Sequence, residues 1–173
     1  MPIAGSITTR AERASRVGAA SLLLVLGLGV GACARPYVAP LLSGPYTGQI
    51  EAPYDAVWRA LVQALSQENV QIRAIARDSG VIASEAVATT IGLYADCGRF
   101  GDARVEGDAQ VAYTIFVQAV SPSETAVQVN TRMRTESYAR GPGKVKLRAP
   151  LACASTGRWE ANLVDTVRAL LRR

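Results

Sequence analysis

Cysteine is the residue type whose chemistry this sequence leaves most open, because three cysteines occur in 173 residues that contain no histidine. A thiol can serve as a nucleophile, a metal ligand, a disulfide partner or a site of acylation. A nucleophilic cysteine usually has a histidine base, and two cysteines without histidine make a poor zinc site. The thiols of Cys33, Cys97 and Cys153 therefore indicate modification or cross-linking rather than catalysis.

Cys33 follows a segment organised like a secretory signal peptide. A short apolar core and small residues come after three basic residues, Arg10, Arg13 and Arg16. The sequence Val30-Gly31-Ala32-Cys33 resembles the lipobox of bacterial lipoproteins, in which the cysteine is acylated and becomes the first residue of the mature protein. This resemblance implies a signal peptide over residues 1–32 and a lipid anchor on Cys33, with more than one acyl chain for stable attachment.

The alternative to a cleaved signal peptide is an uncleaved transmembrane anchor. The uncharged stretch 17–34 lies about at the lower length limit for spanning hydrocarbon, and four of its residues are glycines. Residues 33–46 are rich in proline and are expected to form a short tether from the lipid to the domain. In lipoproteins an aspartate after the acylated cysteine is a familiar inner-membrane retention signal. Ala34 in that position predicts the periplasmic face of the outer membrane, with the inner membrane as the alternative.

Cys97 and Cys153 remain once Cys33 is assigned to lipid. An even number of cysteines in an exported chain is typical of a disulfide. The loop that this bond closes is long, and closing it would restrict the unfolded chain by about 4 kcal/mol in the entropic description. A metal site and a catalytic thiol are the competing interpretations, and the absence of histidine weakens both.

Basic residues are concentrated between positions 132 and 148 and form the candidate contact surface. They are Arg132, Arg134, Arg140, Lys144, Lys146 and Arg148. Such a cluster can face anionic lipid headgroups or an acidic partner. The alternative is a solvated sheet face with a polar loop, where lysines also discourage pairing between molecules.

Two further groups of polar residues are candidate sites. Carboxylates flank Cys97 at Asp96, Asp102, Glu106 and Asp108, but their spacing fits no calcium loop, so no metal ion or other cofactor is predicted. Ser155-Thr156-Gly157 resembles a nucleophile segment only superficially. Ser155 and Thr156 are expected to cap the last helix instead.

Charge and length limit the class of protein. Removing residues 1–32 takes away three arginines and one glutamate from a chain of net charge +5, which leaves +3. This mild charge, together with export, argues against a nucleic-acid partner. About 140 mature residues form one domain with a single modest core.

Periodicity predicts an α+β fold. Apolar residues recur at helical spacing after Pro53 and again from Trp159 to Leu171, and they alternate in strands over 70–74, 81–87, 111–119 and 127–133. Residues 92–107 are expected to be loop-like. The predicted order is β-α-β-β-β-β-α, with a short first strand near Thr47. An antiparallel sheet with two helices on one face makes a two-layer sandwich.

Three segments of this pattern resemble the helix-grip domain of the BamC lipoprotein of the outer-membrane β-barrel assembly machinery. They are Tyr54-Asp55-Ala56-Val57-Trp58-Arg59-Ala60-Leu61, Val70-Gln71-Ile72 and Arg77-Asp78-Ser79-Gly80-Val81-Ile82. Small periplasmic lipoproteins with one such domain are also similar, with matches at Cys97-Gly98 and Cys153-Ala154-Ser155-Thr156-Gly157. The resemblance implies one BamC-like α+β domain over residues 47–173. BamC-type proteins have two grip domains and a long N-terminal stretch, so a role in barrel assembly does not follow directly.

These observations predict a non-enzymatic, lipid-anchored lipoprotein of the cell envelope that binds a protein partner or acts as a scaffold. Its oligomeric state is left open. The alternative is a periplasmic carrier of a small apolar or lipid ligand in a helix-grip cavity. Tyr113, Ile115 and Val129 would line that cavity.

Overall fold

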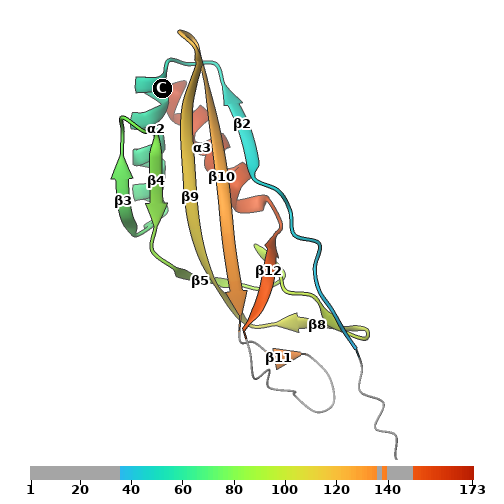
Figure 1. Ribbon diagram of the computed structural model, residues 1–173. Coiled ribbons are helices and arrows are strands. Elements are labelled where there is room, and N and C mark those ends of the chain that lie inside the picture. Colours follow the sequence, from blue (N-terminus) through green and yellow to red (C-terminus); the bar gives the residue numbers. More distant parts are fainter. Residues whose placement is uncertain (1–35, 136–137, 140–149) are drawn as a thin grey trace, which may run out of the picture. The chain divides into compact units, whose positions relative to one another are not determined.

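The computed structural model describes residues 36–135, 138–139 and 150–173. The fold is built on the antiparallel hairpin of β9 (Asp108–Ser121) and β10 (Glu124–Thr135), which are the longest strands described. Both strands alternate between a buried and a solvent-facing side, as the period of two in the sequence predicts. The buried side faces two helices (Figure 1).

Shorter strands extend this hairpin on both edges into an eight-stranded sheet. On the free edge of β9, β4 (Val81–Ser84) and β5 (Val87–Thr90) pair with different parts of the strand, and β3 (Ile72–Ala76) pairs with β4. On the free edge of β10, β2 (Tyr46–Ile50) and β12 (Leu151–Ser155) pair with different parts of that strand. The two-residue strand β6 (Ala95–Asp96) pairs with β12.

The helices α2 (Tyr54–Gln67) and α3 (Arg158–Leu171) supply the second layer. Each buries a stripe at helical spacing, and the stripe of α2 includes Val57, Leu61 and Leu65, which are at most 1% exposed. These side chains pack with the buried face of β9 and β10 in one core. The predicted α+β two-layer sandwich, with an antiparallel sheet and two helices on one face, is confirmed.

A second, four-stranded sheet forms from segments expected to lack regular structure. Its order is β1 (Tyr37–Val38), β7 (Arg99–Phe100), β8 (Ala103–Glu106) and β11 (Tyr138–Ala139). The expectation of a loop over 92–107 was therefore wrong. The segment 36–46, expected to be part of a tether, contains β1, which pairs with β7.

Two local expectations also need correction. The segment 81–87 is not one strand, because the chain leaves β9 after Ser84 and returns to it as β5. Between these two contacts the Ser84 hydroxyl accepts the Tyr113 N–H at 2.9 Å and replaces the missing strand partner. Gly157, not Ser155 or Thr156, is the N-cap of α3, since Ser155 belongs to β12 and the Thr156 hydroxyl donates to the Leu93 carbonyl.

Candidate functional site

Cys97 and Cys153 are joined by a disulfide that crosses 56 positions of sequence. Cys97 is fully buried and Cys153 is 6% exposed. The bond ties the loop between β6 and β7 to β12, and β12 is itself held by β10 at Met133 to Thr135. The disulfide therefore connects the small sheet to the main one.

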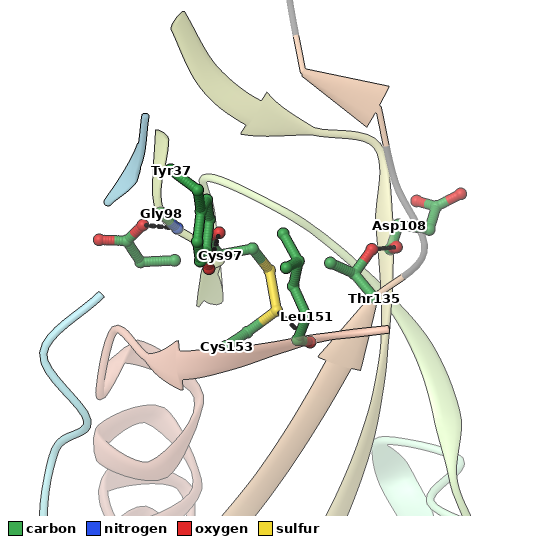
Figure 2. Close-up of a disulfide and its surroundings, with 8 residues drawn as sticks. Tyr37, Cys97, Gly98, Asp108, Thr135, Leu151 and Cys153 are labelled. Atoms are coloured by element: carbon green, nitrogen blue, oxygen red, sulfur yellow. Dashed lines mark hydrogen bonds between the residues drawn. A yellow bond between two sulfur atoms is a disulfide. The ribbon is translucent and has the colours of Figure 1, made fainter. Parts of the chain in front are cut away.

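Tyr37 lies against this disulfide (Figure 2). Its hydroxyl donates to the Cys97 carbonyl at 3.1 Å, and its ring lies 5.1 Å from that of Phe100. Burial, with a smaller contribution from the nearby Asp96 carboxylate, raises the pKa of the Tyr37 hydroxyl. Asp96 accepts the Gly98 N–H at 2.9 Å, so this carboxylate holds a turn. These contacts are structural, as the sequence argument for a cross-link predicts.

A buried carboxylate lies at the start of α3. Glu160 is 2% exposed, and its Oε1 accepts the Thr131 hydroxyl at 2.6 Å, while Oε2 is buried without a partner among the described residues. A pocket of about 210 Å³ lies beside it, in the gap between the parts of β10 that pair with β2 and β12. The first turn of a helix favours a negative side chain, which explains in part why Glu160 is tolerated there.

The interior next to Glu160 is filled by aromatic side chains. Tyr113 stacks on Trp159 with ring centroids 3.6 Å apart. Burial, with the Glu160 charge as the smaller cause, raises the pKa of Tyr113 well above its ordinary value. Tyr113, Ile115 and Val129, which were expected to line a ligand cavity, are at most 4% exposed and belong to the packed core.

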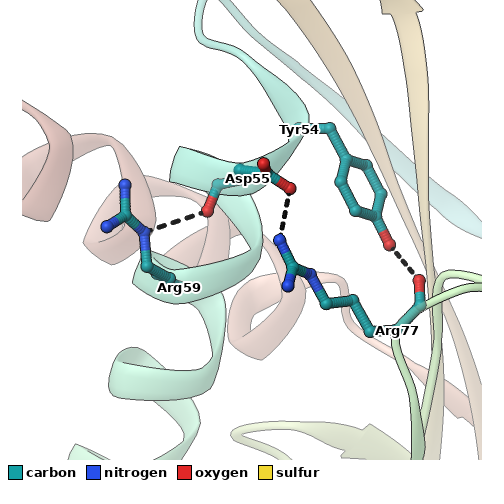
Figure 3. A network of polar contacts seen from close by, with 4 residues as sticks. All are labelled: Tyr54, Asp55, Arg59 and Arg77. Carbon is teal, nitrogen blue, oxygen red and sulfur yellow. Dashed lines mark hydrogen bonds and ion pairs between the residues drawn. The ribbon is translucent and has the colours of Figure 1, made fainter.

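The β3–β4 hairpin is joined to the start of α2 by a polar network (Figure 3). Arg77 donates to Asp55 Oδ1 at 2.6 Å, and the Tyr54 hydroxyl donates to the Arg77 carbonyl at 2.5 Å. Arg59 donates to the Asp55 carbonyl at 3.2 Å. The hydrogen bond to Asp55 raises the pKa of the Arg77 guanidinium.

A groove of about 560 Å³ opens beside this network. We call it the hairpin groove, and its lining residues are Tyr54, Asp55, Arg77, Asp78, Ser79, Gly80, Phe116, Val117, Gln118 and Ala119. It exists because the pairing of β4 with β9 ends at Val81 and Phe116, whereas β9 continues to Ser121. Phe116 is 42% exposed at its wall.

The outer strand β3 is exposed along its whole length. Alternation in the sequence predicted a half-buried strand, but Ile72 and Ile75 are 40% and 53% exposed because β3 is the last strand on this side of the sheet. We call Ile72, Ile75 and the outer backbone edge of this strand the β3 edge. The strand order was the missing information, since alternation alone does not say whether a neighbouring element covers a strand.

The structure describes only part of the predicted basic surface. Arg132 and Arg134 are exposed on the solvent side of β10. Arg140, Lys144, Lys146 and Arg148 lie outside the described residues, as does Cys33. The sequence analysis missed Glu160, although its spacing from Leu163, Val164 and Val167 places it on the buried stripe of α3.

Neither a metal site nor a membrane-spanning helix is found in the part of the chain that the structure describes. Over those residues, no three side chains of histidine, cysteine, aspartate or glutamate are grouped so as to hold an ion. Both helices in the same ranges are too short or too polar to cross a membrane.

Comparisons with known proteins give structural similarity without a match in sequence. No protein-family model and no curated protein sequence matches the chain. Among solved structures, a DUF4468 family protein from Bacteroides ovatus ATCC 8483 is similar, with 17% sequence identity and a TM-score of 0.33. The match covers 62% of this chain and 64% of that chain. At this TM-score the fold description rests on the strands and helices themselves.

Proposed function

We propose that this chain is a non-enzymatic lipoprotein of the cell envelope, anchored by lipid on Cys33, which binds a protein partner through the β3 edge and the hairpin groove. The observation that carries the proposal is the β3 edge. Its isoleucines are exposed at the end of an eight-stranded sheet. An open apolar strand edge is a template for strand addition by a partner segment.

The hairpin groove supports the same surface. It lies at the turn that follows β3, and it combines the exposed Phe116 ring with the Arg77 and Asp78 side chains. An extended segment added to β3 would continue toward this groove. Strand addition gives affinity through main-chain hydrogen bonds, and side-chain pockets beside the edge give specificity.

The carrier function has less support. The three side chains expected to line its cavity are packed in the core, and of these only Val129 borders the pocket of about 210 Å³ beside Glu160. The export signal and the lipobox-like sequence support attachment to the periplasmic face of the outer membrane, with the inner membrane as the alternative. A contribution to outer-membrane assembly or maintenance would fit this location.

Two variants test the binding surface. Ile72→Asp/Ile75→Asp places charges on the β3 edge, while Val62→Asp alters an exposed apolar residue of α2, which is 37% exposed. We expect the first variant to lose a partner recovered by crosslinking in the native envelope, and the second to retain it. Equal recovery by both variants would contradict the proposed surface, and repeated recovery of no partner by the unaltered protein would contradict the function.

The anchor is tested by the intact mass of protein purified from its own envelope. We expect the mass of residues 33–173 plus acyl groups, with two thiols appearing only after reduction. A full-length mass without acyl groups would refute the lipoprotein assignment.

A further inference from the structure

Three large apolar side chains are exposed on the segment that leads from β1 to β2. Val38, Leu41 and Leu42 are 45%, 94% and 70% exposed. We call these three residues the anchor-side patch. Figure 1 shows this segment, in blue, running from the lower end of the long hairpin up to β2, on the β10 side of the sheet, whereas β3 and β4 lie on the β9 side. The patch is therefore separate from the proposed partner surface.

The covalent chain holds the patch close to Cys33. Tyr37 and Val38 pair with Phe100 and Arg99, and the Tyr37 hydroxyl is bonded to the Cys97 carbonyl. Only four residue steps separate Cys33 from Tyr37, and a fully extended chain of that length spans at most about 14 Å. A lipid on Cys33 would thus hold β1 near the bilayer, with much less freedom than a tether extending to residue 46 would give.

Among the described residues, the charged side chains beside the patch balance one another. A groove of about 500 Å³ adjoins the patch, and Val38 and Leu41 line it. The charged side chains that line it are two acidic and two basic residues, Asp96, Arg99, Asp102 and Arg104. Their formal charges cancel, so the exposed leucines supply the attraction to a membrane, through burial at the boundary between headgroups and acyl chains.

We propose that the anchor-side patch rests in the bilayer interface and orients the domain on the membrane. This inference depends on the proposed lipid anchor at Cys33. The anchor keeps the domain near the bilayer, and Leu41 and Leu42 determine which side of the domain contacts it. The β3 edge and the hairpin groove, on the β9 side of the sheet, are then presented away from the membrane to a periplasmic partner.

The test uses the mature lipoprotein, purified with its lipid, in vesicles of phosphatidylcholine that contain a brominated acyl chain. A tryptophan is introduced by Leu42→Trp. The matched control is Val120→Trp, at a residue that is 54% exposed and lies next to the turn between β9 and β10. Trp58 and Trp159 contribute the same background to both variants. We expect bromine to abolish most of the added fluorescence at position 42 and to leave that at position 120 unchanged.

Each outcome separates the inference from the proposed function. Vesicle flotation with acyl groups in the intact mass, but equal quenching at both positions, would overturn the orientation and leave the anchor in place. Failure to float, with an unacylated mass, would refute the anchor itself and the inference with it. If quenching at position 42 requires the anionic lipid phosphatidylglycerol and disappears in high salt, the attraction to the membrane is electrostatic. This result would overturn the inference that the exposed leucines supply the attraction.

Discussion

The turn of the β3–β4 hairpin depends on a glycine that no other residue can replace without displacement of the backbone. Gly80 has φ +68°, and a Cβ built on it would lie 2.1 Å from the Val117 carbonyl oxygen. The Val117 N–H also donates to the Gly80 carbonyl at 2.8 Å. The close approach of the two backbones and this hydrogen bond hold the turn against β9, at the wall of the hairpin groove.

We expect Gly80→Ala to destabilise the fold by about 3 kcal/mol or more. A left-handed conformation costs a residue with Cβ about 1–2 kcal/mol. The Cβ must also move away from backbone, which breaks the hydrogen bond to Val117 at a net cost of about 1 kcal/mol. Loss of packing where the hairpin meets β9 adds to these costs.

Gly92→Ala is the matched control. Gly92 has φ +94°, and a Cβ there would meet nothing within 4 Å. This φ lies further than that of Gly80 from the left-handed minimum near +57°, so the backbone cost at Gly92 is not smaller. Any excess destabilisation of Gly80→Ala over Gly92→Ala therefore measures the close approach to Val117.

Urea denaturation of the oxidised protein measures both variants. A shift in the midpoint at constant slope reports a change in stability rather than in the compactness of either state. Equal losses of stability in the two variants would show that the close approach contributes nothing, and the structural explanation of the turn would then be wrong.

Three more predictions follow from the disulfide, the polar network and the buried tyrosine. Replacement of Cys97 and Cys153 by alanine should lower the free energy of unfolding by about 2–4 kcal/mol, and reduction of the native protein should give the same loss in urea denaturation. Asp55→Asn removes an exposed ion pair with Arg77, so it should cost about 1 kcal/mol or less, and a larger loss would show that this network does more than surface pairing. The raised pKa of Tyr113 means that this side chain ionises first in the unfolded chain, so its contribution to stability should be constant below about pH 10 and fall as pH rises above it. Tyr113→Phe should make that fall shallower, and an unchanged slope in urea titrations at alkaline pH would contradict the burial argument.

Part of the candidate site was accessible from sequence. The turn residues at Asp78-Ser79-Gly80 predicted the hairpin, and the cysteine count predicted the Cys97 and Cys153 pair that the structure joins. The hairpin groove was not accessible, because it arises where β4 ends and β9 continues. The lengths of paired strands depend on which segments meet in space.

The sequence by itself determined the repeating pattern of the fold. The alternation in β9 and β10 reflects the backbone geometry of a strand, and the apolar stripes of α2 and α3 reflect that of a helix. Each pattern can be recognised from the sequence of one element alone. Tertiary structure alone decided which elements lie at an edge. It left Ile75 exposed in β3, buried Glu160 on the stripe of α3, and gave β1 a strand partner in a segment expected to be a loop. Exposure and strand pairing depend on contacts between residues far apart in the chain, and local periodicity does not predict those contacts.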